Sequence, residues 1–176
     1  MSKKTALLIV DVQVMMFTYD DGALYDGEKV LDNIHSLLEK ARASKTPVFF
    51  VQHNGSEDGE FGKGKPAWQI HPQIAPLESE KVIEKTTCDS FSETTLHEEL
   101  QNQGIEKLII VGMQTEYCID TTVRRAFSIG YESVLVKDAH STFDGPVLKA
   151  PQIIEHHNNI IDGRFALLKM TNEIEF

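Results

Sequence analysis

Short apolar runs alternate along the chain with longer segments in which apolar residues recur every three or four positions. The runs are rich in branched residues and lack polar alternates, as expected of strands covered on both faces. We predict strands at residues 6–10, 47–51, 81–83, 108–111, 134–136 and 165–168. The three-to-four-residue period predicts helices around residues 30–41, 96–104, 123–130 and 149–161.

Strands that alternate with crossover helices predict an α/β fold with a mostly parallel sheet and helices on both sides. The chain has 176 residues and no repeat or interdomain linker, so we expect a single domain over residues 1–176. One segment, residues 53–76, contains several glycines and prolines and shows no period. A loop of that length in a compact domain is usually functional or mobile.

Composition narrows the classes of protein. The hydrophobic content of 41% and charged content of 25% are typical of globular proteins. The formal net charge of −10 argues against a nucleic-acid-binding protein, which needs a basic face. We also expect no membrane segment, because no apolar run approaches about 18 residues. The chain starts without a signal-peptide layout, so we expect a cytoplasmic protein whose two cysteines are free thiols.

Three reactive side chains are placed where the predicted strands end. In open parallel sheets, ligands bind beyond the carboxyl ends of the strands. Asp11 and Lys85 follow the first and third predicted strands, and Cys118 lies in a turn after the fourth. With Thr115 as N-cap, Cys118 would lie in the first turn of a helix, where the helix dipole favours a thiolate.

Together these residues would form a Cys-Asp-Lys nucleophilic site, in which the acid accepts the thiol proton and the amine offsets the charge. Taken singly, each has an ordinary structural explanation. Cys118 would be a small buried apolar residue, Asp11 a turn carboxylate and Lys85 a surface amine.

Three stretches in order along the chain also resemble the motifs of one family. Residues 7–17 read LLIVDVQVMMF, and Lys85 is followed by FSETTL at residues 91–96. Residues 112–118 read GMQTEYC. The likeness continues through Gly130-Tyr131 and residues 136–139, and so covers nearly the whole chain. In these motifs the sequence resembles the isochorismatase-like cysteine hydrolases.

The resemblance implies a three-layer α/β/α sandwich around a mostly parallel, Rossmann-like sheet. It implies a catalytic triad of Asp11, Lys85 and Cys118 and a cis peptide between Met113 and Gln114. It also implies an oxyanion hole formed by the backbone N–H groups of Gln114 and Cys118.

The resulting hypothesis is a cysteine-dependent hydrolase of a small amide, imide or carbamoyl compound that acts through a thioester on Cys118, without a cofactor. Members specialised for isochorismate tend to lack the cysteine, so its presence favours acyl chemistry. Two alternatives stay open: a redox-active thiol protein, and a non-catalytic binding member of the fold. Cys88 has no identifiable base partner, and we expect it to be structural.

Nicotinamidases of this family typically carry an Asp/His/His metal cluster after the second strand. Here Val51 stands where the aspartate would be expected, and His53, Asp58 and His71 form only a scattered set. We therefore expect no metal.

Four further residues are candidates for the substrate pocket: Phe17, His53, Trp68 and Tyr117. We expect Gln13 to brace the turn that carries Asp11. Family relatives are commonly oligomers, so we expect a homo-oligomer, a dimer or tetramer, whose only other partner is a small-molecule substrate. The apolar pairs at residues 153–154 and 160–161 would suit either subunit contacts or the core.

Overall fold

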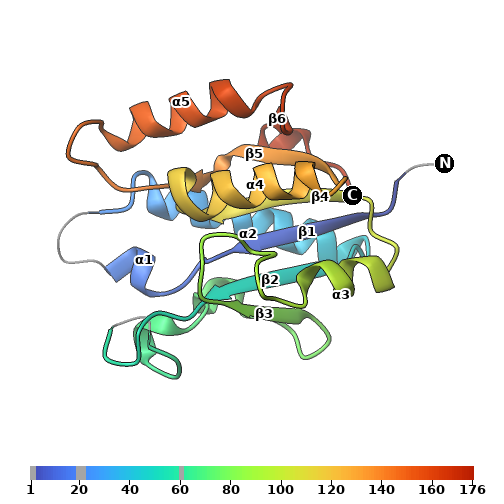
Figure 1. Cartoon of the computed structure of the whole chain (residues 1–176), viewed down its shortest axis with the longest axis horizontal. Coiled ribbons are helices and arrows are strands. Elements are labelled where there is room, and N and C mark those ends of the chain that lie inside the picture. Colours follow the sequence, from blue (N-terminus) through green and yellow to red (C-terminus); the bar gives the residue numbers. More distant parts are fainter. Residues whose placement is uncertain (1–2, 19–22, 60–61) are drawn as a thin grey trace.

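The computed structural model describes residues 3–18, 23–59 and 62–176 of the chain. Its centre is a six-stranded, all-parallel sheet with strand order β3-β2-β1-β4-β5-β6 (Figure 1). The strands are β1 (Thr5–Val10), β2 (Val48–His53), β3 (Lys81–Lys85), β4 (Lys107–Met113), β5 (Glu132–Ser141) and β6 (Leu167–Lys169). The predicted α/β fold with a parallel sheet is confirmed.

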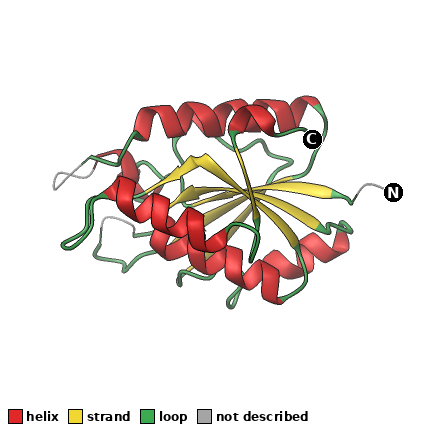
Figure 2. Cartoon of the chain, turned by 90° about the horizontal axis from the view of Figure 1, so that it is seen from above, coloured by secondary structure: helices red, strands yellow, loops and turns green. Residues whose placement is uncertain are grey.

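Helices cover both faces of this sheet, which gives the expected three layers (Figure 2). They are α1 (Met15–Thr18), α2 (Gly27–Ala43), α3 (Leu96–Asn102), α4 (Asp120–Ser128) and α5 (Ala150–Ile161). Successive residues of β1 serve opposite faces, as the period of a strand requires. Leu7 and Ile9 belong to the apolar cluster that includes α2, whereas Leu8 and Val10 belong to the cluster that includes α3 and α4.

Short helical turns occupy much of the remaining chain. They are the 3-10 helices η1 (Pro66–Trp68), η2 (Pro72–Ile74) and η4 (Thr171–Glu173), and the π-helix η3 (Thr115–Ile119). The aperiodic segment 53–76 thus contains two turns of helix, and its residues 60 and 61 lie outside the described residues. Within the described ranges, no helix has the length and apolar character needed to cross a bilayer.

Strand β5 extends well beyond the predicted residues 134–136. Ile110 of β4 pairs with Leu135 of β5, but Gly112, two residues later in β4, pairs with His140, five residues later in β5. This irregularity lets β5 continue beside the end of β4 through polar residues, which an apolar run could not reveal. His140 is thereby buried next to the turn that follows β4.

Gly112 sets how closely β4 approaches β1. Its φ is 127°, and a Cβ added there would overlap the carbonyl oxygen of Val10. Only glycine fits this position. The strand order reverses between β1 and β4, and ligands bind at such a reversal in open α/β sheets. Gly112 therefore brings the chain after β4 against Asp11, whose own φ of 52° lies in the left-handed region.

Candidate active site

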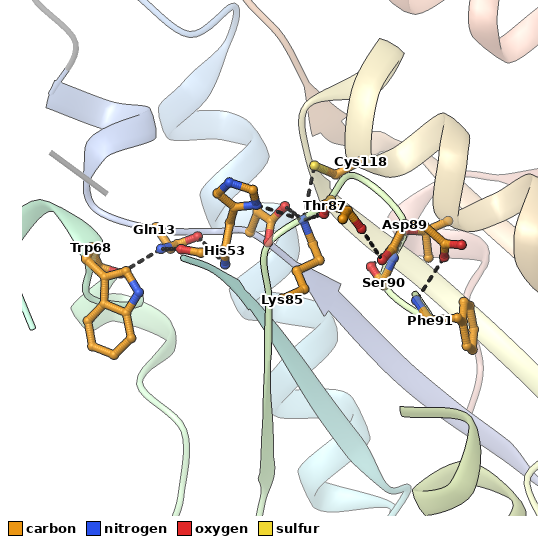
Figure 3. A network of polar contacts seen from close by, with 11 residues as sticks. Gln13, His53, Trp68, Lys85, Thr87, Asp89, Ser90, Phe91 and Cys118 are labelled. Atoms are coloured by element: carbon orange, nitrogen blue, oxygen red, sulfur yellow. Dashed lines mark hydrogen bonds and ion pairs between the residues drawn. The ribbon is translucent and has the colours of Figure 1, made fainter. Parts of the chain in front are cut away.

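The three predicted reactive side chains meet at the carboxyl edge of the sheet. Figure 3 shows two of them, Lys85 and Cys118, directed toward each other. Asp11 follows β1, Lys85 ends β3, and Cys118 lies in η3 after β4. Lys85 Nζ lies 2.6 Å from Asp11 Oδ2 and 3.2 Å from Cys118 Sγ. The side chains of Lys85 and Asp11 are only 0% and 1% exposed. The structure thus brings together an acid, an amine and a thiol that are distant in sequence.

Lys85 is held as a charged ammonium by its surroundings. It donates to the backbone carbonyl of Thr87 at 2.9 Å, and His53 Nδ1 lies 3.4 Å away. Burial lowers the pKa of Lys85, but the Asp11 carboxylate and then Cys118 outweigh burial and raise the pKa above its ordinary value. Burial, followed by the charge of Lys85, lowers the pKa of His53, so that imidazole is neutral.

In the resting site, burial and a nearby carboxylate oppose the thiolate that a helix N-terminus would favour at Cys118. Burial and the nearby Asp11 carboxylate raise the pKa of Cys118, and the opposing effect of Lys85 is smaller. Cys118 lies in the π-helical turn η3, which continues directly into α4, so it lies near the N-terminus of a helical segment, as expected. The resting thiol therefore carries its proton, and Asp11 is the nearby group that can accept it.

Thr115 is also not the N-cap that the sequence predicts. Gln114 occupies the cap position of η3, and no side chain makes a capping hydrogen bond there. The Thr115 hydroxyl instead lies 2.9 Å from His140 Nδ1, and His140 Nε2 lies 3.0 Å from Asn158 Oδ1. Thr115 and His140 are both buried. The predicted cis peptide between Met113 and Gln114 is present just before this turn.

A cavity of about 760 Å³ opens over the thiol. Its lining includes Asp11, Gln114 and Cys118, together with the predicted pocket residues His53 and Tyr117. Tyr117 is 54% exposed, so it lies at the rim rather than in the floor. The volume is suited to a small-molecule ligand.

Two other predicted pocket residues are placed elsewhere. Phe17 lines a separate cavity beside His71, with the two ring centroids 4.8 Å apart. Trp68 is not among the described residues that line the thiol cavity. Its indole N–H donates to Asn54 at 2.7 Å, and its carbonyl accepts from the buried Gln13 side chain at 2.7 Å. These bonds anchor the long loop to the sheet edge, so the structure does not bring Phe17 or Trp68 to the thiol.

Gln13 braces this edge of the sheet, as expected. Its amide donates to the carbonyl of His53 at 3.0 Å and accepts from the backbone N–H of His53 at 2.9 Å. The end of β2 is thereby fixed to the chain that follows Asp11 (Figure 3).

Sequence reasoning missed several residues of the cavity. Glu116, Thr142 and Asp144 line it, and Thr142 donates to Glu116 Oε1 at 2.9 Å. The position of Glu116, two residues before Cys118, was an available signal for its placement. Cys88, expected to be structural, is exposed and also lines the cavity.

The scattered set His53, Asp58 and His71 does not fit a metal ion. His71 Nδ1 already accepts a hydrogen bond from the backbone N–H of Gln73. His53 faces the Lys85 ammonium, and this positive charge would repel a metal cation. Within residues 3–18, 23–59 and 62–176, no group of three His, Cys, Asp or Glu side chains is arranged to hold one.

Comparison with known proteins agrees with this fold. The model of the isochorismatase domain matches residues 5–150. The isochorismatase family protein YddQ of Bacillus subtilis (strain 168) is 35% identical over 173 residues, which cover 95% of this chain and 96% of YddQ. A streptothricin hydrolase of Streptomyces noursei is 33% identical over 170 residues, covering 97% of this chain but only 60% of that protein.

A solved structure, that of an isochorismatase from Pseudomonas putida KT2440, matches with a TM-score of 0.93 at 35% identity. The match covers 97% of this chain and 90% of that one. The family model spans well over half of the chain, and the relatives exceed 30% identity over nearly all of it. The chain therefore belongs to the isochorismatase-like cysteine hydrolase family.

Proposed function

We propose that the protein hydrolyses a small amide, imide or carbamoyl compound through a thioester on Cys118. The observation that carries this proposal is the position of Lys85 Nζ, 2.6 Å from the Asp11 carboxylate and 3.2 Å from the Cys118 sulfur, under a cavity of about 760 Å³. An acid, an amine and a thiol in that arrangement have the parts of an activated nucleophile.

The first step transfers one proton and forms one bond. As Cys118 Sγ attacks the substrate carbonyl carbon, Asp11 accepts the thiol proton, since the raised thiol pKa disfavours a preformed thiolate. Lys85 stays charged and holds the Asp11 carboxylate in place. Because the thiol proton must be removed during attack, the rate depends on Asp11 being ionised.

The second step breaks the C–N bond. We assign the backbone N–H groups of Gln114 and Cys118 to the developing oxyanion, because both residues line the cavity beside the sulfur. Asp11 returns its proton to the leaving nitrogen, which departs as ammonia or an amine and leaves a thioester. Water that Asp11 deprotonates then attacks the thioester and releases the carboxylic acid and the thiol.

The comparisons support hydrolysis but do not identify the substrate. The streptothricin hydrolase of Streptomyces noursei acts, by its name, on streptothricin, and this chain spans 60% of that protein's length. We therefore propose the bond type, a non-peptide C–N bond, rather than one compound.

A screen tests the proposal. Purified protein is incubated with a library of small amides, imides and carbamoyl compounds, and ammonia or amine release is measured. We expect turnover of at least one class by the wild type and none by Cys118→Ala. Equal turnover by the two proteins would refute the proposed role of Cys118.

Cys88 favours one alternative, a redox-active thiol, because it lines the same cavity as Cys118. Mass spectrometry after mild peroxide treatment separates the two functions. A redox protein would form a Cys88–Cys118 disulfide that a thiol reductant reverses, whereas a hydrolase would show an acyl group on Cys118 when substrate is present.

A further inference from the structure

We infer that the cavity selects cationic over anionic substrates, with neutral amides between them, and that Glu116 is the main determinant of this preference. The inference rests on the proposed function, because it concerns the substrate that Cys118 attacks.

The charges around the thiol do not cancel. Asp11, Glu116 and Asp144 line the cavity, and its described lining residues include no lysine or arginine. The ammonium beneath the cavity, Lys85, forms an ion pair with Asp11 at 2.6 Å, so these two charges offset each other. His53 adds no positive charge, because burial and Lys85 lower its pKa.

Glu116 supplies the uncompensated negative charge. Its Oε1 accepts a hydrogen bond from the neutral Thr142 hydroxyl at 2.9 Å. Its Oε2 is buried and has no hydrogen-bond partner among the described residues. Asp144 contributes less, because its carboxylate is 56% exposed and pairs with Lys149 at 2.9 Å. Water and Lys149 therefore screen Asp144, whereas the Glu116 charge is only partly screened.

The consequence for a ligand follows from Coulomb's law. A second charge a few ångströms from Glu116, at the effective dielectric of a partly buried site, interacts strongly enough to change a rate or affinity about tenfold. An ammonium or guanidinium on the substrate gains this attraction, and a carboxylate suffers the opposite effect. The cavity should therefore favour amino-substituted amides and lactams over acidic amides.

Charged thiol reagents test the charge preference of the cavity directly, without knowledge of the substrate. Trimethylammonioethyl, methyl and sulfonatoethyl methanethiosulfonates each react with a thiolate, which forms a mixed disulfide and releases methanesulfinate. The rate at Cys118 is followed by peptide mass spectrometry, so that Cys88 is counted separately, and is divided by the rate with free mercaptoethanol. We expect the cationic reagent to exceed the anionic one by at least about tenfold.

The variant Glu116→Gln removes the charge and keeps an oxygen that can accept from Thr142. We expect the ratio of cationic to anionic rates to fall about threefold or more. Glu106→Gln is the matched control. Glu106 is exposed and precedes the seven-residue β4, so it lies about 20 Å from the end of β4 that leads to Cys118. This variant should leave the ratio unchanged. Should Glu116→Gln fail to fold, raising the salt concentration from about 0.01 M to 1 M must reduce the wild-type ratio instead.

A matched set of amides extends the test to turnover: β-alaninamide, butanamide and succinamate have similar lengths and carry positive, no and negative charge. We expect kcat/KM to decrease in that order. A reactive Cys118 that shows no cationic preference, or that prefers the anions, overturns the inference while leaving the hydrolase proposal intact. Failure of all three reagents to react with Cys118 also overturns the inference. If the reagents show the cationic preference but no thioester forms on Cys118, only the hydrolase proposal is overturned.

Discussion

Two buried polar clusters flank the turn that follows β4, and they differ in how completely their groups are hydrogen bonded. In the cluster of Thr115, His140 and Asn158, both ring nitrogens of His140 have partners, at 2.9 and 3.0 Å. In the cluster of Asp11, Lys85 and Cys118, the Lys85 ammonium lies 2.6 Å from Asp11 Oδ2, but Asp11 Oδ1 is buried and has no hydrogen-bond partner among the described residues.

The difference separates a structural cluster from a reactive one. Buried polar groups in proteins are almost always hydrogen bonded, so an under-satisfied carboxylate requires an explanation. A free lone pair on Asp11 is what a proton acceptor for Cys118 needs. The complete bonding around His140, in contrast, fixes Thr115 and with it the turn that carries the thiol. One cluster positions the turn, and the other is left open for chemistry.

The largest expected effect comes from removing the cation of the reactive cluster. Lys85→Met should lower kcat/KM by about 10³-fold or more, because Asp11 loses its orientation. The unpaired, buried Asp11 carboxylate should also reduce the free energy of unfolding by about 3 kcal/mol. Urea unfolding and steady-state kinetics measure the two effects.

The matched control for this variant is Lys63→Met. Lys63 also pairs with a carboxylate, that of Glu84 at 2.6 Å, but its side chain is 63% exposed. We expect a loss of no more than about 1 kcal/mol. Equal destabilisation by the two variants would contradict the distinction between a buried reactive pair and a surface pair.

The cluster of Thr115, His140 and Asn158 should make the free energy of unfolding depend on pH. Burial lowers the pKa of His140 from 6.5 to about 4. Between these pH values the unfolded chain binds a proton that the folded protein does not, so stability is lost as the pH falls from about 6.5 to 4. The free energy of unfolding, measured with urea, should fall by about 3 kcal/mol over this pH range. His140→Gln should lack this component, and an unchanged pH profile in that variant would show that His140 is not its source.

A smaller effect is expected at the contact between this cluster and the turn. Thr115→Val keeps the shape of the side chain but leaves His140 Nδ1 without its partner, which should cost about 1–2 kcal/mol of unfolding free energy. Ser128→Ala removes an exposed hydroxyl that bonds the carbonyl of Arg124, and it should cost less than about 0.5 kcal/mol. The two unfolding curves are compared at one pH near neutrality, and similar losses would mean that Thr115 is not fixed by His140.

The smallest effect is expected at Trp68. Trp68→Phe removes the hydrogen bond to Asn54 but keeps the backbone carbonyl to which Gln13 donates. Stability should change by about 1 kcal/mol or less, and KM by less than about twofold. A large rise in KM would show that Trp68 contacts the substrate after all.

The sequence predicted the strands because they are buried on both faces and so appear as uninterrupted apolar runs. It placed Asp11, Lys85 and Cys118 at strand ends for the same reason. Their meeting depended on the strand order and on the close approach of Gly112 to Val10, which local periodicity does not encode.

The rest depended on side-chain partners. Thr115 has the residue type of an N-cap, but His140 takes its hydroxyl, and His140 lies on a part of β5 that the apolar pattern could not predict. Phe17 was expected near the thiol because it lies beside motif residues along the chain, and Trp68 because the long aperiodic loop that carries it could supply an aromatic wall for the substrate. Their contacts with His71 and Asn54 hold them elsewhere.

The most direct test is capture of the acyl group on sulfur. The protein is mixed with an amide that it turns over, quenched in acid within the first turnover, and digested for mass spectrometry. We predict an added acyl mass on the peptide that contains Cys118, absent from Cys118→Ala and removed by hydroxylamine. Full turnover with no acyl group ever detected on residue 118, under conditions that preserve a reference thioester, would contradict it.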